Sequence, residues 1–181
     1  MSTRFERKIW TEARSPLLVD PSPRTISTLV DDLERTDSFD LFATDGTLKT
    51  AFDDFAIAAH AADLVAADAL TIHVLDDATE NTLLVTDDFV AALVFLDDQL
   101  LSIGTRDEEA VGAASTFRDQ FDSASEYRIR TPSLSTVEET LADELGDDVA
   151  QEFVQLVDRI ENVSTGTEIT TVALLVAARH H

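Results

Sequence analysis

Hydrophobic and polar positions follow two patterns in the first part of the chain. Short apolar runs bounded by turn residues predict buried strands, and apolar residues spaced three and four apart predict amphipathic helices. We expect strands at 16–20, 39–44 and 70–76, with helices from Pro23 to about Leu33 and over about 46–67 between them. This order predicts a βαβ unit with parallel strands and right-handed crossovers.

The pattern changes after residue 76. Three apolar runs follow one another closely, at 82–86, 89–96 and 99–105. The polar pairs Asp87-Asp88 and Asp97-Asp98 separate them and are short enough for hairpin turns, so these runs predict a β-meander. A helix is expected over about 107–123 and a last edge strand over 126–130, and the amphipathic stretch 4–13 predicts a short helix at the N-terminus.

From Thr131 onward the pattern is helical. One helix, with an apolar stripe, is expected to end at Gly146, and a second covers about 147–161. The first of these helices has two candidate starts, because Ser135 with Glu138 forms a capping-box pattern and Ser133 is a rival cap. The predicted fold is α/β, with a mixed sheet from a βαβ unit plus a meander, helices on its faces, and a C-terminal helical segment. We place an α/β domain at 1–130 and the helical segment at 131–181.

Composition narrows the classes of function. The chain has 181 residues and a net charge of −23, from 36 acidic and 13 basic residues. Nucleic acids and anionic membranes need a basic surface, so this charge argues against binding either one unaided. An acidic chain with no cysteine and two lysines is typical of a cytoplasmic protein from a salt-loving microbe. The alternative is an ordinary acidic mesophilic protein, although such proteins usually carry more lysine.

Motifs for common chemistry are missing from the sequence. No Gly-Lys pair of a phosphate-binding loop and no Gly-x-Ser-x-Gly elbow is present. His60 and His73 have no partner at the spacing of metal ligands, so we interpret both as structural. We therefore expect no metal, no cofactor and no catalytic residue, although a Ser-His-Asp triad stays open from one sequence. The apolar runs are also too short to span a bilayer.

The strongest local candidate is an anion site where the first two strands end. Its candidate residues are Asp20, Ser22, Arg24, Thr44, Asp45 and Lys49. "DPSPRT" (20–25) ends a strand and opens a helix, where free backbone N–H groups and the helix dipole favour an anion such as a phosphorylated metabolite. In open α/β sheets, ligands bind outside such strand ends. The alternative is simple helix capping beside a surface arginine. Arg128 and Arg130 form a second small basic cluster.

Six segments follow one another in a characteristic order: "LLVDPS" (17–22), "TLKTAFDDF" (47–55), "AADL" (61–64), "NTLLVTDD" (81–88), "RTPSLSTVEETL" (130–141) and "LLVAAR" (174–179). Their order and spacing resemble the haloarchaeal transcriptional regulators of the TbsP type. The meander followed by a phenylalanine-bearing helix is, more loosely, similar to the phospholipase-D-like sensor domains of TrmB-type sugar-responsive regulators. The phospholipase motif His-x-Lys-x4-Asp is absent, so that reaction is excluded.

The resemblance implies a two-part regulator, with an N-terminal sensor or dimerisation module and a C-terminal winged helix that binds DNA. In that family "LLVAAR" begins the winged helix, and here the sequence stops at His181. The closing stretch 168–181 is apolar on all sides, and such a helix must be buried on several sides. We therefore expect a truncated winged helix, DNA binding only through the missing part, and a homodimer through the C-terminal helices. The closing His pair is native or an added remnant.

Three functions remain open at this point. The leading hypothesis is the effector-sensing and dimerisation module of a haloarchaeal transcription regulator. The second is an enzyme with a carboxylate site at the strand ends, such as Asp20 or Asp45. The third is a metabolite-binding or interaction protein that acts alone. The sequence identifies neither the ligand nor the target genes.

Overall fold

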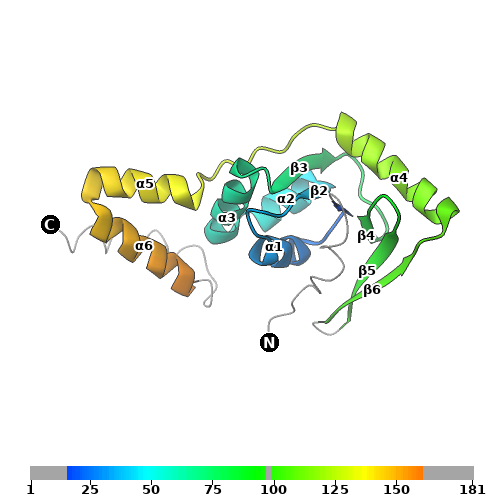
Figure 1. The fold of residues 1–181 in the computed structure, drawn as a ribbon, viewed down its shortest axis with the longest axis horizontal. Helices are drawn as coiled ribbons and strands as arrows, with labels where there is room; N and C mark the ends of the chain where they lie inside the picture. Colours follow the sequence, from blue (N-terminus) through cyan, green and yellow to red (C-terminus); the bar gives the residue numbers. More distant parts are fainter. Residues whose placement is uncertain (1–15, 97–98, 161–181) are drawn as a thin grey trace. The chain divides into compact units, whose positions relative to one another are not determined.

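The computed structural model describes residues 16–96 and 99–160 (Figure 1). Two compact units make up the chain. The described residues up to Ala51, together with Leu64–Arg128, form the first unit, and Phe52–Asp63 with the described residues from Ile129 onward form the second. The predicted fold class is confirmed: a mixed sheet carries helices and is followed by a helical segment.

The first unit contains one six-stranded sheet. Its strands are β1 (Leu17–Val19), β2 (Phe39–Thr44), β3 (Leu70–Leu75), β4 (Thr82–Val85), β5 (Val90–Leu96) and β6 (Gln99–Thr105). Its helices are α1 (Pro23–Asp32), α2 (Asp45–Ala51) and α4 (Glu108–Ser123), and α3 (Phe55–Ala66) passes from the second unit into the first. The second unit adds α5 (Leu134–Leu145) and α6 (Asp147–Ile160).

The strand order in the sheet is β3-β2-β1-β4-β5-β6. The first three strands are parallel, and β4, β5 and β6 continue the sheet as an antiparallel meander. Both the βαβ unit and the meander are therefore confirmed. Apolar residues sit at consecutive positions of β1 because that strand is buried on both faces, and Leu17, Leu18 and Val19 are all fully buried.

One face of the sheet is covered by α4. Phe121 and Ala114 of this helix form a buried cluster with Phe42, Leu75 and Val85 of three strands. Side chains alternate between the faces of a strand, so Leu18, Leu41 and Ile72 point to the opposite face, where they are also buried. Both faces of the parallel part are therefore packed.

Four predictions about single elements have clear outcomes. The helix expected over 46–67 is two helices, because the carboxylate of Asp54 accepts hydrogen bonds from the backbone N–H groups of Ala56 (2.9 Å) and Ile57 (3.4 Å) and caps α3. The expected hairpin turn at Asp87-Asp88 is confirmed, since the N–H of Thr86 donates to the carbonyl of Phe89 at 2.9 Å.

The prediction of an edge strand over 126–130 is wrong. It is reduced to an isolated bridge between His73 and Glu126, flanked by bonds from Val74 N–H to Ser125 (2.9 Å) and from Tyr127 N–H to Ile72 (2.8 Å). The chain leaves the sheet there, so pairing ends after one bridge.

The cap of α5 is Ser133, the rival of the capping-box candidate. Its hydroxyl oxygen accepts from the N–H of Thr136 at 3.2 Å. Ser135 lies inside the helix, and its hydroxyl donates to the carboxylate of Asp63 on α3 at 2.5 Å. The helix expected over 4–13, the turn at Asp97-Asp98 and the apolar stretch 168–181 lie outside the described residues.

Candidate functional site

The two strand ends predicted to form the site lie next to each other. Strands β1 and β2 are parallel neighbours, with Val19 in register with Phe42. The N–H of Asp20 donates to the carbonyl of Phe42 at 2.7 Å, which ties the end of β1 to β2. The residues that follow β1 and β2 therefore share the carboxyl edge of the parallel strands, as the sequence predicts.

Asp20 holds the connection between β3 and β4. Its carboxylate accepts hydrogen bonds from the N–H of Thr79 (2.6 Å) and from the hydroxyl of Thr79 (3.4 Å), and its carbonyl accepts from the hydroxyl of Thr82 (2.9 Å). Its backbone adopts a positive φ of 48°, which aspartate tolerates better than most residues. The contacts make Asp20 an organiser of this edge of the sheet.

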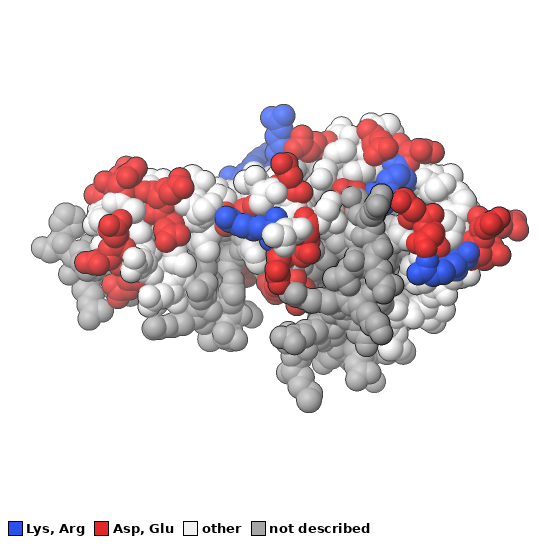
Figure 2. All heavy atoms as spheres, viewed as in Figure 1, with Lys and Arg blue, Asp and Glu red and all other residues white. Residues whose placement is uncertain are grey.

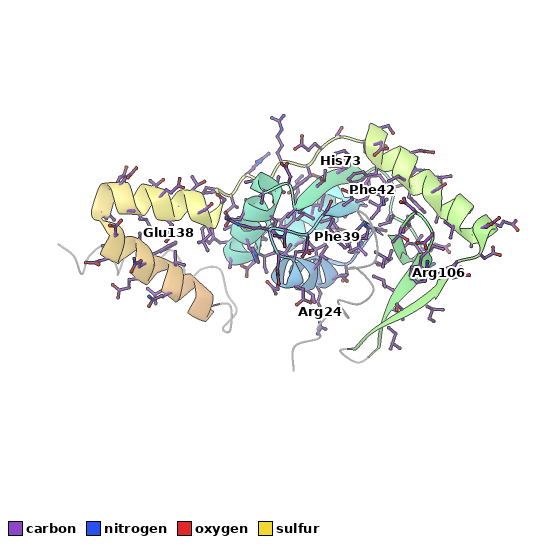
Figure 3. The ribbon with its side chains drawn as sticks, viewed as in Figure 1. Arg24, Phe39, Phe42, His73, Arg106 and Glu138 are labelled. Carbon is purple, nitrogen blue, oxygen red and sulfur yellow. The ribbon has the colours of Figure 1, made fainter. Side chains whose placement is uncertain are left out.

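Ser22 begins α1 as its N-cap. The hydroxyl oxygen accepts from the N–H of Thr25 at 3.2 Å and lies 2.8 Å from the hydroxyl oxygen of Thr25, which is almost fully buried. Pro23 occupies the first helical position, where its missing N–H costs nothing. Arg24 follows in the exposed first turn of α1 (Figure 3).

At the end of β2, a side-chain hydroxyl again caps the following helix, and the lysine of that helix is paired with a carboxylate. The hydroxyl of Thr44 accepts from the N–H of Thr47 at 3.3 Å and so starts α2. Asp45 and Lys49, one helical turn apart, form an ion pair at 2.6 Å. Both side chains are more than half exposed, so the pair contributes little stability, but the Lys49 charge lies beside a carboxylate. Arg24 and Lys49 are the two cationic candidates among the predicted site residues.

A second polar group lies under α4, and the sequence analysis missed it. Asp40 of β2 and Arg118 of α4 form an ion pair at 2.5 Å, with side chains 16% and 26% exposed. Arg118 also donates to the carbonyl of Val85 at 3.4 Å. Burial raises the pKa of the Asp40 carboxyl above its ordinary value, while the Arg118 cation opposes that rise. An aspartate inside the apolar run "FDLFAT" was the available signal.

The side chain of His73 packs against an aromatic residue of α4. Its ring stacks on Phe121 with centroids 4.2 Å apart, and Nδ1 lies 2.5 Å from the carbonyl oxygen of Phe121. Phe42, on the neighbouring strand, contacts the same Phe121 ring edge-on, with the ring centroids 5.6 Å apart. Within residues 16–96 and 99–160, His, Asp and Glu side chains form no group of three or more that could hold a metal ion.

Comparison with known protein families identifies the family of this chain. The profile of the family described as "Transcriptional regulator TbsP-like, N-terminal" matches residues 3–132. The chain belongs to this family. The resemblance to TbsP-type regulators is therefore confirmed at the level of the N-terminal part. No curated protein and no solved structure matches this TbsP-like chain. The helices in its described part are too short or too polar to cross a membrane.

Proposed function

We propose that this TbsP-like chain is the effector-sensing and dimerising module of a haloarchaeal transcription regulator, without enzymatic activity. The observation that carries the proposal is the family match over residues 3–132, which covers the α/β unit. Regulators of transcription work by binding and by changes of conformation. A ligand shifts such a protein only by its differential affinity for two states.

DNA contact is assigned to other parts of the regulator. Acidic side chains are spread over the face shown in Figure 2, and basic ones are few and scattered. A net charge of −23 opposes the approach of phosphates, which require clustered Lys and Arg. The same acidic, lysine-poor composition supports the proposed haloarchaeal origin and a cytoplasmic location, because concentrated salt screens self-repulsion.

The proposed effector is a small phosphorylated metabolite bound at the start of α1. The positive end of the helix dipole favours an anion there. Ser22 and Arg24 supply a hydroxyl and a guanidinium in the same turn, and Thr44 lies at the end of the neighbouring β2. Lys49 would join the site by exchanging its partner Asp45 for the ligand.

Dimerisation is proposed through the C-terminal helices. Along α5, Leu134, Val137 and Leu141 are partly buried against Ala56 and Phe153 of the second unit, yet no residue of α5 is fully buried. A further residue of the same stripe, Leu145, is 47% exposed. An apolar stripe that the described part of its own unit covers incompletely is suited to a second copy.

A ligand screen tests the sensor. We would measure thermal unfolding at the lowest KCl concentration that keeps the chain folded, with inorganic phosphate and a panel of phosphorylated sugars. A binding metabolite should raise the midpoint in a concentration-dependent way. Arg24→Ala should abolish that shift, whereas Arg35→Ala, three residues beyond the end of the same helix, should keep it. Shifts of equal size in both variants would show that the compound does not bind at the start of α1. No shift with any compound would count against effector sensing.

A further inference from the structure

The hairpin of β5 and β6 exposes a cluster of large apolar side chains. Ile103 is 72% exposed, Leu101 42% and Val94 38%. In the pairing register, Val94 lies opposite Leu101, and Ile103 lies opposite Ala92, two residues before Val94. Because side chains alternate along a strand, the three share one face of the sheet. We call these three residues the hairpin patch.

Coverage of this face by α4 ends before the hairpin patch. Helix α4 packs over β3, β4 and β5, and Val90 at the start of β5 belongs to the cluster beneath it. Val94 lies on the same face of β5, four residues after Val90, and its side chain is exposed. The hairpin projects past the end of β4 (Figure 1). Among the described strands, β6 has a neighbour on one side alone, so it is an edge of the sheet.

Charge indicates what can approach this surface. Residues 89–105 carry two charged residues, Asp97 and Asp98 between the strands, whereas 27% of the whole chain is charged. Two copies with a net charge of −23 each repel one another, and the repulsion is smallest where neutral surfaces meet. Strand β6 also has no Lys, Pro or acidic residue, which sheet edges commonly use to prevent association.

We propose that the hairpin patch packs face to face on the hairpin patch of a second copy of this chain. A two-fold contact places the same apolar residues on both sides, so one neutral patch is sufficient. Pairing of β6 edge to edge would leave Ile103 exposed on the open face, whereas face-to-face packing removes it from water. The interface is independent of the dimer proposed through the C-terminal helices.

The strength and salt dependence of this contact follow from its size and charge. Stable interfaces bury about 800 Å² on each partner, more than three side chains supply, so the contact is weak and depends on protein concentration. Salt should strengthen it, because repulsion between the chains is screened within ~3 Å at about 1 M. A chain that uses both surfaces forms dimers through one and tetramers or longer assemblies through the two.

Sedimentation velocity of the full chain over a concentration series, in KCl at about 1 M, tests the proposal. Ile103→Asp should weaken the concentration-dependent association at least about tenfold, as loss of a central apolar contact does. Leu101→Lys should act in the same direction. Ser102→Asp is the matched control, because it adds the same charge on the opposite face of β6 and should leave the association unchanged.

Each other outcome overturns the proposal in a recognisable way. Equal weakening by Ile103→Asp and Ser102→Asp would indicate edge pairing. A lower melting temperature for Ile103→Asp with unchanged association would indicate that the chain itself covers the hairpin patch. Unchanged association and melting would leave the patch without a self-partner. Leu145→Asp separates the two interfaces, since it should remove the dimer through the C-terminal helices and keep the association that Ile103→Asp removes.

Discussion

Replacement of Arg118 by Met tests how α4 is held on the sheet. The variant keeps most of the apolar stem of the side chain and removes the guanidinium, so the carboxylate of Asp40 loses its cation at 2.5 Å. Two unit charges with centres about 4 Å apart interact by about 4 kcal/mol at an effective dielectric constant of about 20. Both side chains keep some exposure, which lowers this figure, so we expect a loss of about 2–3 kcal/mol near neutral pH.

The pH dependence of that loss identifies its cause. Burial already raises the pKa of Asp40 above 3.8, and loss of Arg118 raises it further. The folded state then binds a proton more tightly than the unfolded chain, so the unfolding free energy falls as the pH rises through the folded pKa. The cost of Arg118→Met should therefore be greatest near neutral pH and shrink as the pH approaches 3.8.

Urea unfolding at fixed KCl, followed by circular dichroism at several pH values, measures this effect. The matched control is Asp40→Asn with Arg118→Met, which removes both charges and should cost less than about 1 kcal/mol relative to the parent. An Arg118→Met penalty that stays constant with pH, or that equals the penalty of the double variant, would refute the explanation by an unpaired buried carboxylate.

Two further predictions concern the backbone. A Cβ atom at Gly104 would clash with the Phe89 ring and lie 2.8 Å from the carbonyl oxygen of Val90, so Gly104→Ala should destabilise by about 1–3 kcal/mol. Gly46→Ala, with open space around it, should be neutral or stabilising, and equal urea midpoints for the two variants would contradict this. Ser133→Ala should cost about 1 kcal/mol by removing the cap of α5, measured in the same way, and no loss would show that capping there is unimportant.

Local patterns were sufficient to predict most of the sheet. The run "FDLFAT" gives β2 at the residues where the structure has it, because a strand packed on both faces is apolar at most of its positions. Ser22 followed by Pro23 predicts the start of α1 for a similar local reason, since both residues act on the first helical turn. Elements whose physical cause lies within a few residues are readable from the sequence.

Contacts between distant residues were not readable. Asp20 binds Thr79, and Asp40 binds Arg118, across separations of 59 and 78 residues. Periodicity carries no information about such pairs, so Asp20 was interpreted as a ligand group, while its carboxylate organises the connection before β4.

A choice between local candidates also depended on the fold. Both Ser133 and Ser135 suit a helix start, and the sequence pattern favoured Ser135 through Glu138. The structure decides for Ser133, whose hydroxyl accepts from the N–H of Thr136, whereas the Ser135 hydroxyl donates to the Asp63 carboxylate of α3. A local pattern that two neighbouring residues both satisfy does not decide between them.

Transcript levels in host cells report whether this chain regulates transcription. Cells that lack the chain would be compared with cells that carry the wild type, Arg24→Ala or the control Arg35→Ala, before and after a change in sugar supply. We expect that loss of the chain alters a defined set of transcripts, that the wild type and Arg35→Ala restore their response to sugar, and that Arg24→Ala leaves them fixed at one level. Identical transcripts with and without the chain, under both conditions, would contradict a role in transcription regulation.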